Sequence, residues 1–323
     1  MSEDRSLDIG TGRGGVGADS PTDIPAGGWK DIAQRVLDEV REDQVPVVAA
    51  GLAFYTLLAV FPALIAFVSI YGLVADPASV TRRISELSGS LPEGASTLIT
   101  TQLQQIVETS SAALSWTAVG AVLAALWSAS GGAHHLIKAL DAAYDEEESR
   151  GFFHLRGVSL LLTLVFLALG GIALGLIVVV PPLLESLAPA ALVTWAVMIG
   201  RFLLLAGILM VALAIVYRYA PDRQEPRWEW VSAGAGAAVV MWIVASILFS
   251  VYVANFGSFG ETYGSLAGVV VLLLWFYISA FSVLVGAELN AEMEHQTAED
   301  TTHGEEEPLG RRGAEKADSF ARR

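Results

Sequence analysis

The sequence predicts an all-α, polytopic membrane protein with six transmembrane helices, a short N-terminal amphipathic helix and a helical outer loop. Of its 323 residues, 54% are hydrophobic and only 16% are charged, and the mean hydropathy is +0.54. A soluble domain is typically about a quarter charged. Charged residues are absent from discrete apolar blocks, each of which is long enough to cross a bilayer. The absence of Cys excludes disulfides and thiolate chemistry.

Six apolar blocks form the predicted membrane domain, which runs from residue 29 to residue 292. A helix needs about 20 residues to span a hydrocarbon core of about 30 Å, and each block reaches that length. Because lipid offers the backbone no hydrogen-bond partners, each block is expected to be helical. The predicted spans are at about 45–75, 113–137, 158–180, 191–217, 231–254 and 266–288.

The two ends of the chain differ from the membrane domain in composition. Residues 1–28 are rich in Gly, Ser, Asp and Thr, and residues 293–323 are acidic and polar, so both are expected to be disordered tails. Before the first span, apolar residues recur at helical spacing, as in Trp29, Ile32 and Val36. This pattern predicts an amphipathic helix that lies either on the membrane surface or against the underside of the bundle.

Basic residues are distributed unevenly between the predicted loops. Of the 19 Lys and Arg residues, all except Arg82, Arg83 and Arg201 lie in the terminal segments or in the loops after the second and fourth spans. The positive-inside rule therefore places both termini in the cytoplasm, on a chain that crosses the membrane several times. The lipid bilayer is then its first expected partner.

The largest predicted outer loop, residues 76–111, is expected to form a pair of amphipathic helices that caps the outer face. Within the spans, small residues recur at every fourth position, as in Gly120, Ala124, Ser128 and Gly132. Such stripes let helix backbones approach closely. They suit packing within one chain and packing between copies equally well, so a homo-oligomer is one of the expected arrangements.

Three segments of the sequence resemble the YihY/BrkB family of bacterial inner-membrane proteins. They are AAGLAFYTLLAVFPALIAF (49–67), YRYAPDR (217–223) and FGSFGETYGSLAGVVVLLLWFYISAFSVLVGAELNAE (256–292). The resemblance covers residues 29–294 and implies an integral protein of the bacterial cell membrane with six spans. The family once carried the name ribonuclease BN, a label regarded as a misassignment. Transport and envelope roles have been suggested for it, so the resemblance defines the class of protein better than its activity.

Polar residues near the predicted span ends supply candidate cavity-lining positions. Arg201 is the charge deepest in a predicted span, where an unpaired Arg costs roughly 2.5 kcal/mol or more. It either extends outward to the headgroups or contacts an anion at the mouth of a cavity. The break between the fifth and sixth spans is either a re-entrant loop or a tight hairpin. Its polar and glycine candidates are Asn255, Glu261, Tyr263 and Gly264.

Three further residues are candidates for gating or proton movement. Pro62 removes a backbone donor from the first span and predicts a kink, which is either static or part of a gate. Tyr55 lies two turns before it on the same predicted helix. Glu288 closes the sixth span at the predicted cytoplasmic interface, as a simple interfacial carboxylate or as part of a proton relay.

The sequence predicts no enzyme, metal or cofactor site. Walker-type phosphate loops, GxSxG and HExxH are all absent. His134 and His135 point about 100° apart on a helix, so they are not expected to share a metal ion. The formal net charge of −15 argues against nucleic acid as a partner, since a ribonuclease needs a basic RNA-binding surface. No catalytic, metal-binding or cofactor-binding residue is therefore expected.

Two functional hypotheses remain. The first is a transporter or permease-like protein for a small solute, ion or lipid whose identity the sequence does not give. The proline in the first span, the small-residue stripes and the polar break before the sixth span favour it, and without a nucleotide site any active transport would be secondary. The alternative is a non-transporting envelope scaffold or interaction protein that binds partners through the outer loop and the acidic tails.

Overall fold

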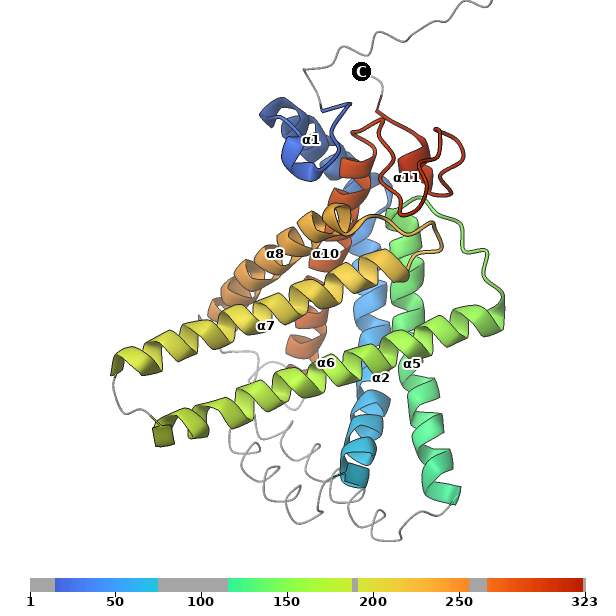
Figure 1. The fold of residues 1–323 in the computed structure, drawn as a ribbon. Helices are drawn as coiled ribbons and strands as arrows, with labels where there is room; N and C mark the ends of the chain where they lie inside the picture. The colour runs from blue at the N-terminus through green and yellow to red at the C-terminus, as the bar shows by residue number, and fades with distance from the viewer. Residues whose placement is uncertain (1–14, 75–115, 188–190, 256–265, 322–323) are drawn as a thin grey trace, which may run out of the picture.

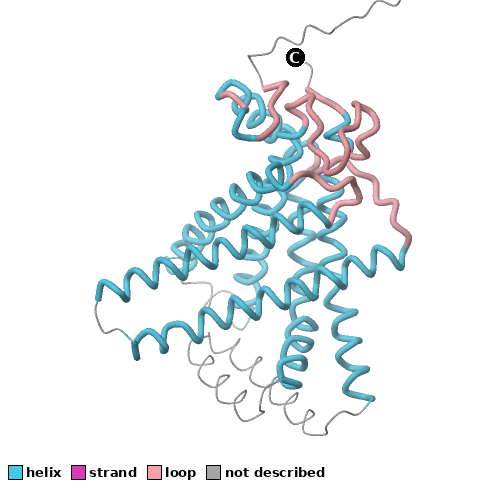
Figure 2. Tube along the Cα trace, viewed as in Figure 1, coloured by secondary structure: helices cyan, strands magenta, loops and turns pink. Residues whose placement is uncertain are grey.

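The computed structural model describes residues 15–74, 116–187, 191–255 and 266–321. Within these ranges the long elements are all helices, which confirms the all-α fold class (Figure 2). The predicted outer helical loop, residues 76–111, lies outside the described residues. So do three of the candidate site residues, Glu261, Tyr263 and Gly264.

Six long apolar helices form the body of the protein (Figure 1). They are α2 (Val45–Val74), α5 (Trp116–Ala143), α6 (Phe152–Leu187), α7 (Ala191–Tyr219), α8 (Trp228–Asn255) and α10 (Ala267–Glu294). All of them except α5 are long and apolar enough to cross a membrane. Helix α5 is less apolar because His134, His135, Lys138 and Asp141 lie in its last turns. The polytopic membrane class is confirmed, whereas the count of six spans stays a prediction.

Helix α10 occupies the centre of the bundle, packed against α2, α5 and α8. Glycines allow its close contact with α8. A Cβ at Gly234 would overlap the carbonyl oxygen of Gly286, and a Cβ at Gly286 would lie 2.7 Å from the Cβ of Ala238. Helix α10, which carries much of the longest family-like segment, is therefore also the helix against which α2, α5 and α8 pack.

Helices α2 and α5 run side by side (Figure 1). A Cβ at Gly132 of α5 would lie 2.9 Å from the Cβ of Ala59, so this glycine permits a close approach to α2. At the other end of the same stripe, a Cβ at Gly120 would have no neighbour within 4 Å among the described residues. Within the described residues, the predicted packing stripe contacts α2 at Gly132. Helix α2 itself continues through Pro62.

The terminal segments lie together at one end of the bundle, which we call the polar end (Figure 1). It comprises the starts of α2 and α8, the ends of α5, α7 and α10, and the segments that cover them. Helix α1 (Ala26–Glu42) follows the short 3-10 helix η1 (Pro21–Asp23) and packs against α10. Its Ile32 is buried with Trp230 and Met293. Of the two predicted positions for this amphipathic helix, the structure has the one against the bundle.

Residues 296–321, which we call the C-terminal strap, fold back over the polar end and include the short helix α11 (Glu315–Asp318). The strap pairs with the loop after α7, where the backbone N–H of Arg227 donates to the carbonyl of Thr301 over 2.8 Å. It also contacts the N-terminal segment, since the N–H of Ala298 donates to the carbonyl of Val16 over 2.7 Å. Three parts of the chain that are distant in sequence are thereby joined.

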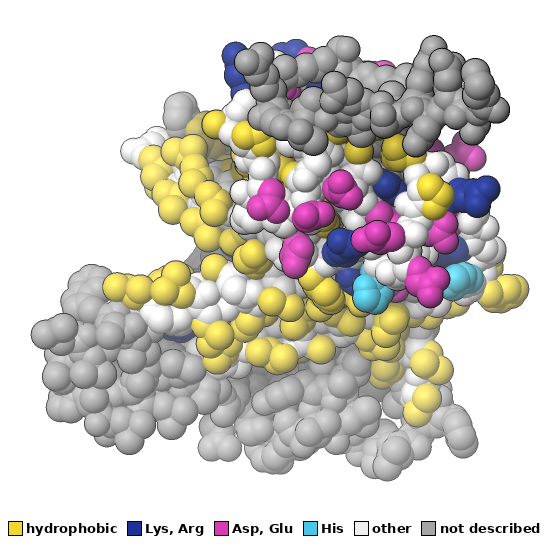
Figure 3. Space-filling model, turned by 45° about the horizontal axis from the view of Figure 1, so that its top comes forward, with side chains coloured by type: hydrophobic (Ala, Val, Ile, Leu, Met, Phe, Trp, Pro, Cys, Tyr) yellow, Lys and Arg dark blue, Asp and Glu magenta, His cyan; other side chains and the backbone are white. Residues whose placement is uncertain are grey.

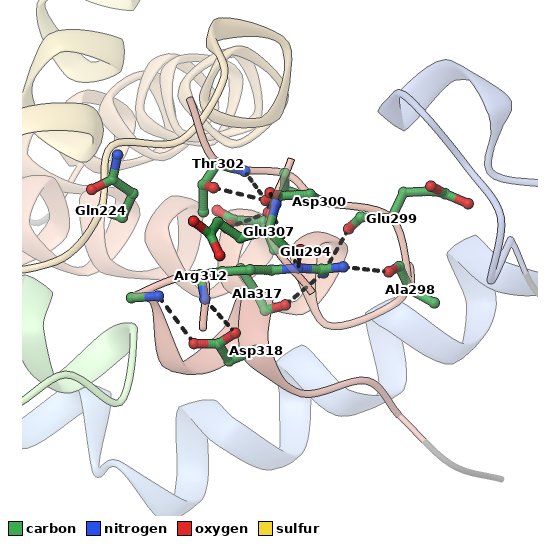
Figure 4. Close-up of polar contacts among 12 residues, drawn as sticks. Gln224, Glu294, Ala298, Glu299, Asp300, Thr302, Glu307, Arg312, Ala317 and Asp318 are labelled. Atoms are coloured by element: carbon green, nitrogen blue, oxygen red, sulfur yellow. Dashed lines mark hydrogen bonds and ion pairs between the residues drawn. The ribbon is translucent and has the colours of Figure 1, made fainter. Parts of the chain in front are cut away.

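Arg312 holds the strap together from within (Figure 4). Its guanidinium group donates hydrogen bonds of 2.7–3.0 Å to four backbone carbonyls, those of Ala298, Glu299, Glu307 and Ala317. The order of the strap differs from the expectation that residues 293–323 form a disordered tail. The order of the strap comes from polar contacts, which do not require a periodic pattern of apolar residues in the sequence.

Candidate functional site

Two of the family-like segments meet at the polar end. One is the last part of α10, from Gly286 onward, and the other is the segment 217–223 at the end of α7. Figure 3 shows acidic and basic side chains gathered at this end, with apolar side chains on the flanks below. Four polar residues of α10 are fully buried there: Glu288, Asn290, Glu292 and Glu294.

Asn290 joins α10 to α8 and α5. Its Oδ1 accepts a hydrogen bond of 2.8 Å from the N–H of Gly234, and its Nδ2 donates to the hydroxyl of Tyr144 over 3.3 Å. The same Nδ2 lies 3.4 Å from the carbonyl oxygen of Val231. A buried amide without partners would cost about 1–3 kcal/mol, so these contacts fix the register of α10 against α8.

Glu294 forms a buried ion pair with Arg223 from the loop after α7. Nη2 of Arg223 lies 2.5 Å from Oε2 of Glu294, and both side chains are fully buried. The hydroxyl of Thr301 in the strap donates to the same oxygen over 3.1 Å. Burial alone would lower the pKa of Arg223, but the Glu294 carboxylate raises it above its usual range. The pair stays charged and ties the end of α7 to α10 and the strap.

Glu292 is the centre of an ion-pair cluster between α1, α10 and the strap. Arg35 of α1 contacts its Oε2, and the ammonium of Lys316 in α11 lies 2.9 Å from its Oε1. The same ammonium lies 2.8 Å from Oδ2 of Asp145 and 3.1 Å from Oε1 of Glu39. Burial lowers the pKa of Lys316, but the carboxylates of Glu292 and Asp145 outweigh it and hold the pKa above its usual range.

Glu288 lies one turn before this cluster and has no comparable partner. Its side chain is 0% exposed, and neither carboxyl oxygen has a hydrogen-bond partner among the described residues. It lines a small pocket between the start of α2 and the ends of α5 and α10, with room for about one water molecule. The other lining residues, all apolar except the first, are Asp43, Val45, Val48, Ala139, Ala142, Ala143 and Leu284.

Asp43 is the second carboxyl group of this pocket and lies at the corner between α1 and α2. Burial raises the pKa of Asp43, and the carboxylates of Asp145 and Glu39 raise it further. The facing side chain of Glu288 and the ammonium of Lys316 oppose this rise and do not cancel it. Two carboxyl groups therefore share one largely apolar pocket, and the nearby cation is already paired elsewhere.

A further buried carboxylate, Asp141, connects α5 to the loop after α7. Its Oδ1 accepts a hydrogen bond of 2.9 Å from the N–H of Asp222, while its Oδ2 has no partner among the described residues. Burial raises the pKa of Asp141 to about 6. Asp222 itself accepts from the hydroxyl of Ser149 over 2.6 Å and lies 3.5 Å from Arg150.

Two candidates from the sequence lie in α2. The ring of Tyr55 stacks on His135 of α5, with ring centres 3.4 Å apart and planes inclined by 10°. Pro62 lies two turns further along the same continuous helix. The stacking explains how Tyr55 joins α2 to α5, whereas a gating role for Tyr55 and Pro62 stays a prediction.

Arg201 and Asn255 lie on α7 and α8, away from the polar end (Figure 1). Nδ2 of Asn255 donates to the carbonyl of Val251 on its own helix over 2.8 Å. The guanidinium carbon of Arg201 lies 5.4 Å from the ring centre of Phe202, and its buried Nε has no hydrogen-bond partner among the described residues. No hydrogen bond or ion pair within the described part of the chain brings Arg201 and Asn255 together.

Sequence reasoning identified Glu288 but missed Asp43 and Lys316 as its neighbours. Asp43 precedes the first span, and Lys316 lies in a segment without an apolar period. No sequence spacing relates either residue to Glu288, because α1 and the strap approach α10 only in the folded chain. A signal did exist for Arg223 and Asn290, since both lie within the family-like segments.

A family model described as virulence factor BrkB matches residues 36–310. The chain belongs to this family. The matched range covers the six long helices and includes Asp43, Arg223 and Glu288, but it ends before Lys316. The BrkB relationship confirms the family that the three sequence segments indicated and places the protein among membrane proteins.

Several relatives resemble this BrkB-family chain over most of their length. A Bacillus subtilis protein named "Putative ribonuclease-like protein YfkH" is 32% identical over 249 residues, which cover 75% of this chain and 88% of the relative. A UPF0761 membrane protein of Pseudoalteromonas translucida is 28% identical over 282 residues, covering 85% of this chain and 88% of the relative. One from Alteromonas mediterranea is 27% identical over 270 residues, covering 82% and 88%. No solved structure matches the chain.

Proposed function

We propose that this BrkB-family protein is a secondary transporter of the bacterial cytoplasmic membrane that moves a small solute, ion or lipid, with its polar end in the cytoplasm. The observation that carries the proposal is the buried carboxyl group of Glu288, unpaired among the described residues, in the pocket between α2, α5 and α10. Ionisable groups within membrane helices are costly, and those that proteins retain commonly mark ion and solute pathways.

The cover over the pocket supports this proposal. Helix α1 and the strap hold each other over the end of α10, because Arg35 and Lys316 both contact Glu292. The pocket beneath them has room for about one water molecule. Movement of these terminal segments together with the corner at Asp43 would expose Glu288, which is buried in the present arrangement, to the cytoplasmic solution.

Flux through liposomes that contain the purified protein tests the proposal. The panel should include inorganic ions, amino acids, organic acids and fluorescent lipids, with protein-free liposomes as the reference. We expect at least one of these to cross faster with the protein, and Glu288→Gln to abolish the difference because it removes the ionisable group at nearly constant size. Glu305→Gln, which removes an exposed carboxylate of the strap, is the matched control and should leave the rate unchanged.

Equal flux with and without protein across the whole panel would overturn the proposal, and full flux in Glu288→Gln would overturn the role of its carboxyl group in transport. The scaffold alternative predicts the reverse pattern in cells. Deleting residues 1–28 or 297–323 would then abolish the phenotype that the intact gene gives to the cells, whereas Glu288→Gln would leave that phenotype unchanged.

A further inference from the structure

We propose that Asp43 and Glu288 form a proton-binding carboxyl pair that holds one proton between the two side chains. The inference rests on the proposed function and deepens it, because the proton becomes the ligand of the same pocket and the ion that drives transport. It concerns a contact between the α1–α2 corner and α10 that no single stretch of the sequence contains.

The first argument is the chemistry of hydrogen bonding. An ionised carboxylate can only accept hydrogen bonds, so two ionised carboxylates cannot bond to each other. Glu288 and Asp43 face each other across the pocket, and neither oxygen of Glu288 has a donor among the described residues. One proton on either group would supply the missing donor and convert the contact into a strong charge-assisted hydrogen bond.

The second argument is the charge around the pair. The charged and titratable groups that face it are Glu39 of α1, Tyr144 and Asp145 after α5, Lys316 of α11 and, one turn along α10, Glu292. The ammonium of Lys316 already contacts the carboxylates of Glu39, Asp145 and Glu292. Two more ionised carboxylates against apolar walls would repel each other, and Lys316, which already contacts three carboxylates, compensates only in part; one shared proton removes that cost.

A metal ion fits the pocket less well than a proton. Hard cations such as Ca²⁺ take about six or more oxygen ligands. The pocket offers two carboxyl groups, and its other lining residues are Val, Ala and Leu. Within the described residues there is no group of three or more His, Asp or Glu side chains placed to hold a metal.

Infrared spectroscopy of the full-length protein in lipid tests the pair directly. A protonated carboxyl group gives a C=O stretching band that is separate from those of ionised carboxylates and shifts in D₂O. The spectra should be recorded in mildly alkaline buffer, because Asp141, whose pKa is about 6, is ionised there and does not contribute to the band. We expect such a band from the unmodified protein. Its shift on labelling with ¹³C-Glu or ¹³C-Asp would show which carboxyl group carries the proton.

Glu288→Gln and Asp43→Asn should each remove the band, because the amide becomes the donor and the remaining carboxylate ionises. Glu305→Gln should leave the band in place. A missing band in the unmodified protein would overturn the pair, as would a band that persists in both pocket variants. The isotope labels keep the test decisive if either variant fails to fold.

The infrared result is independent of flux, so the two proposals can fail separately. If both pocket variants lose the band while the unmodified protein gives no flux above that of protein-free liposomes, the carboxyl pair stands and the transport proposal fails. If the unmodified protein has no band while Glu288→Gln loses flux, transport stands and the shared proton is overturned.

Discussion

The polar end and the flanks of the helical bundle are built in different ways. At the polar end the side chains are held by other parts of the same chain, and Tyr144, Tyr217 and Glu288 are fully buried. Further along α7 and α8, large apolar side chains face outward, with Leu203 68% exposed and Leu248 65% exposed. The charged side chains and the apolar flanks are correspondingly separated on the surface (Figure 3).

The difference arises because the flanks of the bundle face lipid, whereas the polar end faces water. Lipid tails are as apolar as Leu, so an outward-facing Leu costs little in a bilayer and needs no partner within the protein. At the polar end, carboxylates and guanidinium groups lose their water on burial and therefore require defined partners. Glu294 and Glu292 have such partners, whereas Glu288 does not, and this contrast singles out its pocket as the functional candidate.

The largest expected effect comes from breaking a buried ion pair at the polar end. Arg223→Met should lower the free energy of unfolding by about 3–5 kcal/mol, because it leaves the Glu294 carboxylate buried without its cation. Unfolding in mild detergent, followed by circular dichroism, measures the change. Arg41→Met is the matched control, since its pair with Asp38 is exposed and should contribute less than about 1 kcal/mol. Equal losses in the two variants would show that burial of the first pair is unimportant.

A smaller loss is expected from crowding the contact between α8 and α10. Gly234→Ala should destabilise the protein by about 3 kcal/mol, because the new Cβ overlaps the Gly286 carbonyl and Asn290 Oδ1. Gly236→Ala, two residues along the same helix, places its Cβ 3.6 Å from the nearest atom of Met210 and should be neutral or slightly stabilising. The same unfolding assay compares them, and similar stabilities would contradict the tight crossing.

The third prediction concerns pH and Asp141. Its pKa rises from 3.8 to about 6 on folding, so the folded chain keeps this proton over a range where the unfolded chain has lost it. The contribution of Asp141 to stability therefore falls as pH rises between these values and stays lower above them. Asp141→Asn keeps an acceptor for the N–H of Asp222 and mimics the protonated form.

Above pH 6, Asp141→Asn should be more stable than the unmodified protein by up to about 3 kcal/mol, from the size of the pKa shift. Below pH 4 this advantage should disappear, because Asp141 is then protonated in both states. Unfolding curves at a series of pH values check this. A difference that does not vary with pH would show that burial of the carboxylate is not its cause.

The smallest effect is expected on the lipid-facing part of the bundle. Leu203→Ala should change the free energy of unfolding by only about 0.5 kcal/mol, because the side chain lies at the surface. Leu140→Ala, at a fully buried position near the polar end, should cost about 2–5 kcal/mol. Unfolding in detergent compares the two, and a large loss from Leu203→Ala would indicate that its face is covered, for example by a second copy of the chain.

The apolar blocks of the sequence predicted the helices well and their ends less well. The first predicted span, 45–75, closely matches α2 (Val45–Val74), whereas the span predicted at 158–180 lies inside the longer helix α6 (Phe152–Leu187). Hydropathy reports the part of a helix that lies in hydrocarbon, while backbone hydrogen bonds continue the helix into polar surroundings. The strap was not predictable in this way, because contacts such as those of Arg312 leave no periodic pattern.

The candidate site was predictable only in part, for a related reason. Glu288 was identifiable as a charge at the end of an apolar block. Asp43 and Lys316 look like ordinary solvated residues in the sequence, and only the approach of α1 and the strap to α10 brings them close to it. Arg201 and Asn255 were candidates for the mouth and the lining of a cavity, each with a simpler alternative. The described contacts of each are with neighbours on its own helix, and a cavity that both residues line stays a prediction.

The central claim is that a buried carboxyl group at the polar end takes part in ion movement. The most direct measurement is the charge displaced after a rapid pH step, recorded from liposomes that carry the protein on a solid-supported membrane. The account predicts a transient current for the unmodified protein and for Glu305→Gln, and none for Glu288→Gln. An equal current in Glu288→Gln, or no current from the unmodified protein, would contradict it.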